Sequence, residues 1–160
     1  MPHVATILIL CTGNSARSIL GEAVLNHVGA GRLRAFSAGS QPTGIPNPQA
    51  LALLRAKGLD TGFARSKSWD EFAAPGAPGL DIVITVCDSA AAEACPYWPG
   101  APVRAHWGLP DPASAPDADA PAAFAATWDA LERRVAAFLA LPPELDAAAL
   151  QQALNRIGTQ

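Results

Sequence analysis

A cysteine and an arginine stand six positions apart near the start of the chain, in the segment Cys11-Thr-Gly-Asn-Ser-Ala-Arg17-Ser18. The apolar run before it, residues 4–10, is typical of a buried strand, and the residues after it suit a tight loop that opens a helix. The N–H groups of such a loop and the positive end of the helix dipole lower the pKa of a thiol and bind an oxyanion. Arg17 can fold back over the loop and grip two oxygens of a tetrahedral anion. We therefore expect a nucleophile and an anion clamp in one loop.

A cysteine and an arginine at this spacing also occur by chance, and a cysteine is often only a small buried residue. The surroundings favour chemistry, because a strand precedes the pair, a helix follows it, and Gly13 stands where a tight backbone needs freedom. Polar side chains nearby can brace such a loop with hydrogen bonds. The oxyanion is therefore expected to bind at Thr12, Gly13, Asn14, Ser15, Ala16, Arg17 and Ser18.

The chain has 160 residues, 50% of them apolar, and a net charge of −3. This length fits one domain with a sizeable core. The mild acidity gives no basis for a nucleic-acid or acidic-membrane partner, and no apolar stretch approaches the ~20 residues that span a bilayer. The start of the chain lacks a signal-peptide pattern, so we expect a cytoplasmic protein. Three cysteines, an odd number in a reducing compartment, indicate catalytic or redox use rather than a structural disulfide framework.

Strand and helix patterns alternate along the chain. Strands are predicted at residues 4–10, 33–37, 80–86 and 103–109, and helices at residues 19–28, 49–57, 122–141 and 146–157. Asn47 suits the N-cap of the second helix and Pro48 its first position, while Ser68 can cap a further short helix. The segment rich in Pro, Ala and Asp that ends at Pro121 is expected to be a loop.

This alternation predicts right-handed βαβ units and a parallel sheet with helices on both faces. Ligands of such sheets bind beyond the carboxyl ends of the strands. The first strand delivers Cys11 to that edge, the third delivers Cys87, and the loop after the fourth delivers Asp111. We expect these three side chains to lie on one rim.

The segment 11–18 resembles the phosphate-binding loop of the low-molecular-weight protein tyrosine phosphatase superfamily, and more closely that of its arsenate reductase branch. Further matches extend the resemblance over residues 4–140, at Ser37-Ala38-Gly39, Asn47-Pro48, Ser66-Lys67-Ser68, Thr85-Val86-Cys87-Asp88, His106-Trp107-Gly108 and Asp111-Pro112. The resemblance implies an α/β, flavodoxin-like three-layer fold with a four-stranded parallel sheet. Residues 1–142 would form the catalytic domain and residues 143–160 a C-terminal helical extension.

An arginine with backbone amides suits arsenate and its mimics phosphate and sulfate, so the resemblance implies that Cys11 attacks arsenate. Asp111, kept protonated by burial, would donate a proton to the departing oxygen. The alternative for Asp111 is a plain turn residue, because Asp-Pro commonly starts a turn.

Cys87 and Cys95 separate a reductase from a phosphatase. In the thioredoxin-coupled arsenate reductases that the chain resembles, Cys87 would attack Cys11, expel arsenite and leave a disulfide, which Cys95 would then take over. Residues 88–94 must loop or unwind for this step, since a disulfide needs α-carbons within about 7 Å. Taken singly, Cys87 could be a small core residue and Cys95 a half-buried loop thiol. Thioredoxin would dock near Pro96-Tyr97-Trp98-Pro99; a glutaredoxin with glutathione is the other donor.

Two positions depart from the family. Ala16 stands where the phosphatases and many of these reductases carry a second cysteine. Lys67 stands where some relatives place the Asp of a potassium site, whose other ligands match Asn14, Glu22 and Ser37. Because an ammonium can take the place of a monovalent cation, we expect no potassium requirement. The three histidines are scattered and no CxxC pair occurs, so we expect no metal and no other cofactor.

The sequence therefore favours an arsenate reductase with Cys11, Arg17, Asp111, Cys87 and Cys95 as its reactive residues, and with weak phosphatase activity. The alternative is a phosphatase that hydrolyses phosphotyrosine or small phosphoesters, although Ala113 stands where phosphatases follow Asp-Pro with a tyrosine. A third reading is a regulatory module that only binds an oxyanion.

Overall fold

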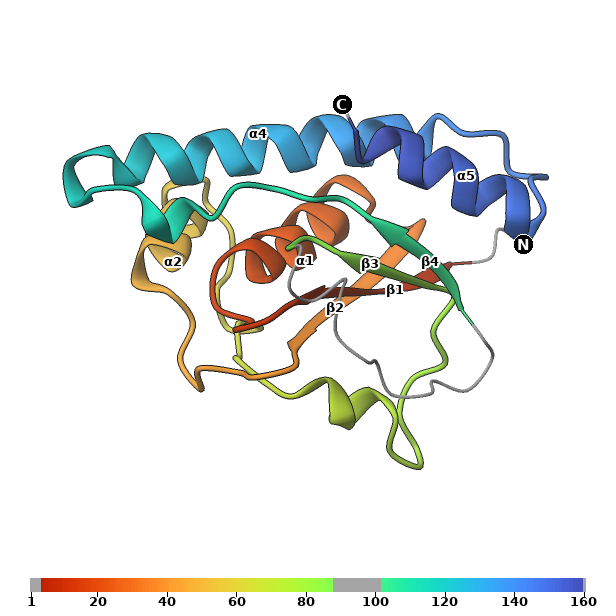
Figure 1. Ribbon diagram of the computed structural model, residues 1–160, viewed down its shortest axis with the longest axis horizontal. Helices are drawn as coiled ribbons and strands as arrows, with labels where there is room; N and C mark the ends of the chain where they lie inside the picture. The colour runs from red at the N-terminus through yellow and green to blue at the C-terminus, as the bar shows by residue number, and fades with distance from the viewer. Residues whose placement is uncertain (1–3, 88–101, 160) are drawn as a thin grey trace.

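A parallel four-stranded sheet forms the centre of the computed structural model, which describes residues 4–87 and 102–159 (Figure 1). Its strands are β1 (Ala5–Cys11), β2 (Leu33–Gly39), β3 (Ile82–Thr85) and β4 (Val103–His106), in the order β2-β1-β3-β4. The helices are α1 (Arg17–Val28), α2 (Pro48–Ala56), α4 (Ala120–Leu139) and α5 (Ala147–Ile157). The prediction of an α/β fold with a four-stranded parallel sheet is confirmed.

Alternating side chains of the strands build two apolar layers, one on each face of the sheet. On one face the side chains of Ile7, Ile9 and Ile84 pack with those of α1, α4 and α5. On the other face Leu8, Leu10 and Val83 meet Phe72 of the 3₁₀ turn Trp69–Phe72. β1 is apolar on both sides because it lies between β2 and β3 with both faces covered.

The register of the strands aligns their carboxyl ends. Cys11 at the end of β1 lies opposite Gly39 at the end of β2, and Leu10 lies opposite Thr85 at the end of β3. The backbone bonds continue beyond the strands, since the Val86 N–H donates to the Leu10 carbonyl. Residues just after three different strands are therefore held at one edge of the sheet.

Two helices begin at side-chain caps, and the first of these caps was predicted from the sequence. The side chain of Asn47 accepts from the Gln49 N–H at the start of α2, and Asp146 caps α5 in the same way. The predicted loop before Pro121 differs, because it contains the 3₁₀ turns Pro112–Ser114 and Asp117–Asp119 and α4 starts at Ala120. Pro121 lies in the first turn of α4, where proline is tolerated.

Helix α5 runs along the outer edge of β4, which has no neighbouring strand in the described part of the sheet, and lies beside α4 (Figure 1). Two of its side chains, Gln151 and Asn155, accept hydrogen bonds from the backbone N–H groups of Arg104 and His106, at 3.3 and 2.9 Å. The indole N–H of Trp107 donates to the Leu154 carbonyl at 2.9 Å. The last turn of α5 thus holds the chain just beyond β4.

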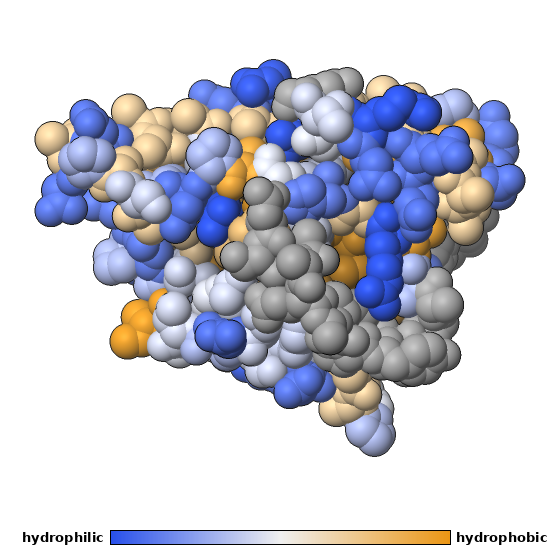
Figure 2. Space-filling view, in the orientation of Figure 1, coloured by the Kyte–Doolittle hydropathy of each residue, from blue (hydrophilic) through white to orange (hydrophobic). Residues whose placement is uncertain are grey.

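The described surface exposes two large apolar side chains, Val4 and Ile45. The face in Figure 2 mixes hydrophilic and mildly hydrophobic side chains along α4, and its strongly hydrophobic side chains form small separate areas. None of the helices in residues 4–87 and 102–159 is both long and apolar enough to cross a membrane.

Candidate active site

Residues 11–18, the anion loop, leave the end of β1 and enter α1. The backbone carbonyls of Thr12 and Gly13 point outward, where they accept hydrogen bonds from the N–H groups of Gln41 and Thr43 at 2.9 and 3.0 Å. A planar trans peptide directs the next N–H to the opposite side, and the Gly13 N–H indeed reaches the thiol of Cys11. The loop therefore turns its amides toward the cysteine.

Asn14 fixes the turn of the anion loop. Its φ of 46° lies in the left-handed region, and asparagine is among the few residues that tolerate it. The buried amide nitrogen donates to the hydroxyls of Ser18 and Ser37 at 2.8 and 3.0 Å, and its oxygen accepts from the Lys67 N–H at 2.9 Å. These three bonds fix the conformation of the anion loop.

Gly39 permits the anion loop to lie directly on the end of β2. A β-carbon at this position would lie 2.4 Å from the Thr12 carbonyl oxygen and 2.9 Å from that of Cys11. Backbone atoms cannot move aside as the end of a side chain can. The sequence showed Gly39 only as part of a motif, and the close approach becomes visible in the structure.

Helix α1 starts without a side-chain cap, because Ala16 occupies the N-cap position. The first N–H groups of a helix need acceptors, so this end is suited to an oxyanion. The buried Nε–H of Arg17, the first residue of α1, also has no acceptor in the described part of the chain. An anion bound at this helix start could satisfy donors of either kind.

Arg17 reaches from α1 to residues 107–111, the acid loop. Its Nη1 donates to the Leu109 carbonyl at 2.9 Å, and its Nη2 lies 3.9 Å from Oδ2 of Asp111. The side chain of Asp111 is 42% exposed, so the expectation that its carboxyl is buried is wrong. Its carboxylate also accepts from the Ala113 N–H at 3.0 Å, which is the turn role considered from the sequence. Asp111 thus starts a turn and faces the arginine.

Cys87 lies beside Cys11 at the edge of the sheet, and both are buried. The two thiols are in hydrogen-bond contact. The sulfur of Cys87 lies 3.3 Å from the backbone nitrogen of Thr12 and 3.5 Å from its hydroxyl. Neighbouring amides of the anion loop, those of Thr12 and Gly13, therefore hold the two sulfurs. The role of Thr12 toward Cys87 had no signal in the sequence, because the two residues meet only through the pairing of β1 with β3.

The pKa of the Cys11 thiol is raised above its ordinary value, contrary to the expectation from the sequence. The hydrogen bond with Cys87 is the largest cause, and burial adds to it. Arg17 and the Gly13 N–H act in the opposite direction but do not outweigh them. The sequence predicted Cys87 on the same rim, but not that its hydrogen bond to Cys11 and the burial of the thiol would outweigh the amides and the arginine.

Glu22 and Lys67 form a buried ion pair next to the anion loop. Nζ of Lys67 lies 3.9 Å from Oε1 of Glu22, and the two side chains are 6% and 7% exposed. The same Oε1 accepts from the Ser37 hydroxyl at 2.5 Å. Burial raises the pKa of Glu22 and lowers that of Lys67, and each charge partly reverses the shift of the other. The ammonium lies among the residues expected from the resemblance to surround a cation.

Cys95 and the aromatic segment 96–99 lie outside the described residues. The other predicted residues, Cys11, Arg17, Cys87 and Asp111, come together at the carboxyl edge of the sheet. Within residues 4–87 and 102–159, no group of three or more His, Cys, Asp or Glu side chains could hold a metal ion.

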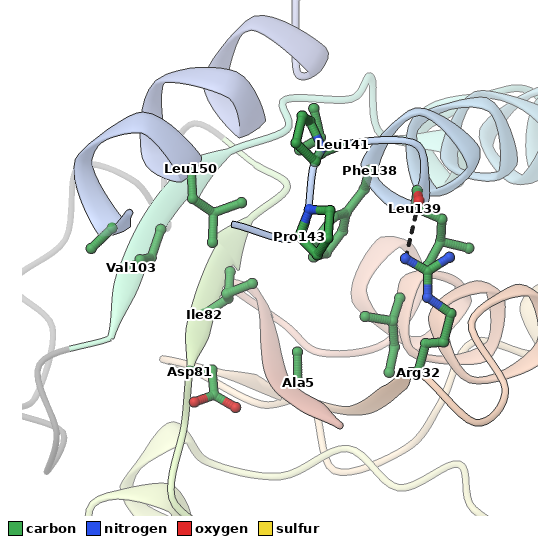
Figure 3. A pocket seen from close by; sticks show the side chains of 13 residues that line it. Ala5, Arg32, Asp81, Ile82, Val103, Phe138, Leu139, Leu141, Pro143 and Leu150 are labelled. Atoms are coloured by element: carbon green, nitrogen blue, oxygen red, sulfur yellow. Dashed lines mark hydrogen bonds between the residues drawn. The ribbon is translucent and has the colours of Figure 1, made fainter. Parts of the chain in front are cut away.

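A cavity of about 510 Å³ lies at the opposite edge of the sheet (Figure 3). Its walls come from the starts of the four strands, from the end of α4, from the connection that follows it and from α5, with Ile82, Leu141 and Leu150 among them. Arg32 and Asp81 are its charged members. Because no cysteine lines it, we place the candidate active site at the carboxyl edge.

Comparison with known proteins identifies the family of the chain. Residues 6–155 match the family model of low molecular weight phosphotyrosine protein phosphatases. The chain is 40% identical over 111 residues to an arsenate reductase of Bacillus licheniformis, covering 69% of this chain and 76% of that protein. It is 34% identical over 134 residues to an arsenate reductase of Halalkalibacterium halodurans, covering 82% and 93%. The structure of an arsenate reductase from Archaeoglobus fulgidus shares the fold, with a TM-score of 0.61 at 24% identity over 81% of this chain and 98% of that chain.

Proposed function

Because this chain belongs to the low-molecular-weight phosphotyrosine protein phosphatase family and to its arsenate reductases, we propose that it reduces arsenate to arsenite with thiols of its own. The observation that carries the proposal is the contact of two buried thiols, Cys11 and Cys87, beside an uncapped helix N-terminus. A hydrolase needs only the first of these thiols, whereas a reductase needs both.

In the first step arsenate binds to the anion loop and Cys11 attacks arsenic. The guanidinium of Arg17 and the amides of the loop neutralise the oxygens. One oxygen leaves as water with the proton that the thiol of Cys11 gives up, and Asp111 at the rim would relay this proton to the departing oxygen.

In the second step the sulfur of Cys87 attacks the sulfur of Cys11. A sulfur–sulfur bond forms, the sulfur–arsenic bond breaks, and its electron pair leaves with arsenic, which is reduced from As(V) to As(III). The two cysteines supply the two electrons. The Thr12 N–H and hydroxyl, both in contact with Cys87, would stabilise its thiolate for this attack.

In the third step Cys95 would attack Cys87 and free Cys11 for the next turnover. A thiol donor, thioredoxin or glutaredoxin with glutathione, would then reduce the Cys87–Cys95 disulfide. Such a donor implies a reducing compartment, so we place the reaction in the cytoplasm.

The test is release of arsenite in a single turnover by fully reduced protein without external thiol. The wild type should release arsenite and lose two thiols, while the Cys87→Ser variant should bind arsenate and release none. Arsenite release by Cys87→Ser would contradict the relay. No arsenite from the wild type, together with hydrolysis of an aryl phosphate that survives Cys87→Ser, would instead make the protein a phosphatase.

A further inference from the structure

The guanidinium of Arg134, on α4, is buried beneath the acid loop. Its Nη1 donates to the carbonyl oxygens of Trp107 and Gly108 at 3.0 and 3.3 Å, and its Nη2 donates to that of Gly108 at 3.3 Å. Arg134 is 6% exposed and its neighbour Arg133 is exposed. A single guanidinium thus holds two consecutive carbonyls at the start of the acid loop.

A buried guanidinium is costly unless hydrogen bonds replace its water. Burial lowers the pKa of Arg134, and the charge of Arg133 lowers it further. An apolar side chain at this position of α4 would be buried at a smaller cost in desolvation free energy. The planar fork of an arginine, however, can bind two carbonyls at fixed angles, which neither a lysine nor an apolar side chain can do.

The next carbonyl along the chain is held from the other side. That of Leu109 accepts from Nη1 of Arg17, the arginine that faces Asp111. Three consecutive carbonyls, those of residues 107, 108 and 109, therefore bind two arginines from two helices. Two residues later the chain reaches Asp111, so a shift at Gly108 would move both the carbonyl that orients Arg17 and the carboxylate.

We propose that Arg134 is a positioning residue for the reaction at Cys11. By fixing the backbone of Trp107 and Gly108 it sets the distance of Asp111 from the bound oxyanion and the orientation of Arg17. It does not touch the substrate. The proposal rests on the function proposed above and adds to it a residue that acts through the acid loop.

The test is a double-mutant cycle between Arg134→Lys and Asp111→Asn, read as the rate constant of arsenite release in a single turnover. Arg134→Lys should slow release by about tenfold, a part of the 10²–10⁴ that a general acid contributes. In the Asp111→Asn background the same substitution should cost less than about twofold, because the group it positions is already lost. An equal loss in both backgrounds would overturn the proposal and leave Arg134 a structural residue.

Arg133→Lys is the matched control, an exposed arginine one position away that should leave the rate unchanged. Thermal melts of all variants show whether the fold persists. If Asp111→Asn is too slow to follow, hydrogen exchange of backbone amides is the second test. The Ala113 N–H donates to the Asp111 carboxylate, and Arg134→Lys should make this amide exchange faster while exchange in α1 stays unchanged. Unchanged protection of Ala113 would overturn the proposal.

Hydrolysis of an aryl phosphate separates this proposal from the proposed function. If the wild type releases no arsenite but hydrolyses the ester, the function proposed above fails. The coupling between Arg134 and Asp111 should still appear in hydrolysis, because both reactions need a proton on the leaving oxygen. Its absence there would overturn the positioning role as well.

Discussion

Arg17 lies with its Nη2 atom 3.9 Å from Oδ2 of Asp111, while its Nη1 donates to the carbonyl of Leu109. The anion clamp is thus turned toward the acid loop, and its buried Nε–H has no acceptor in the residues described. An oxyanion in the loop would satisfy this donor and would separate the guanidinium from the carboxylate. If the loop binds the substrate, we expect this contact to couple substrate binding to the position of Asp111.

Replacing Arg17 by lysine should weaken anion binding. Lysine keeps the charge but loses the planar pair of donors, so we expect the dissociation constant of phosphate to rise about tenfold to a hundredfold. Titration calorimetry of the reduced protein measures it. Arg65→Lys is the control, because Arg65 pairs with Glu71 at the surface and is 61% exposed. Equal phosphate affinity of Arg17→Lys and the wild type would argue against the clamp.

Replacing Cys87 by alanine should lower the pKa of Cys11. The hydrogen bond with Cys87 is the largest cause of the raised pKa, and the substitution leaves Arg17 and the Gly13 N–H, which lower it. A raised pKa means that Cys11 stays protonated at neutral pH, and a thiol is alkylated only as thiolate. The pH profile of iodoacetamide labelling at Cys11, followed by mass spectrometry in a Cys95→Ser background, should therefore move to lower pH. A profile that stays in place or moves to higher pH would contradict the assignment of the shift to Cys87.

The order of the elements and the convergence of Cys11, Arg17, Cys87 and Asp111 could be predicted from the sequence. Both follow from local rules: apolar runs make buried strands, and parallel strands carry the residues that follow them to one edge. The electrostatics could not be predicted in this way. The raised pKa of Cys11 depends on a thiol brought beside it by strand pairing, and the exposure of Asp111 depends on how the acid loop lies on α4.

Lys67 should make the protein independent of potassium, because its ammonium already lies beside Glu22. Reductase activity in potassium and in sodium salts at equal ionic strength should agree, and a several-fold gain in potassium would refute this.

Lys67→Met should leave Glu22 buried and unpaired, at a cost of about 3–5 kcal/mol in the free energy of unfolding. Urea denaturation measures the loss. Lys57→Met is the control, since Lys57 is exposed over the ring of Trp128 and should cost less than about 1 kcal/mol.

Replacing Gly39 by alanine should disturb the anion loop. The added carbon would lie 2.4 Å from the Thr12 carbonyl oxygen, so the loop must move away from β2. We expect a loss of about 1–3 kcal/mol in stability and weaker phosphate binding. The control is Gly79→Ala, where an added carbon meets nothing within 4 Å. A Gly39→Ala variant that melts and binds phosphate like the wild type would show that the loop does not depend on this contact.

The cover that α5 provides for β4 has a consequence for association between molecules. An edge strand with unpaired N–H groups is a template for a strand of another chain, and such pairing leads to aggregates. Here the amide oxygens of Gln151 and Asn155 already occupy the N–H groups of Arg104 and His106. Two sheets therefore cannot pair through these two N–H groups while α5 is in place.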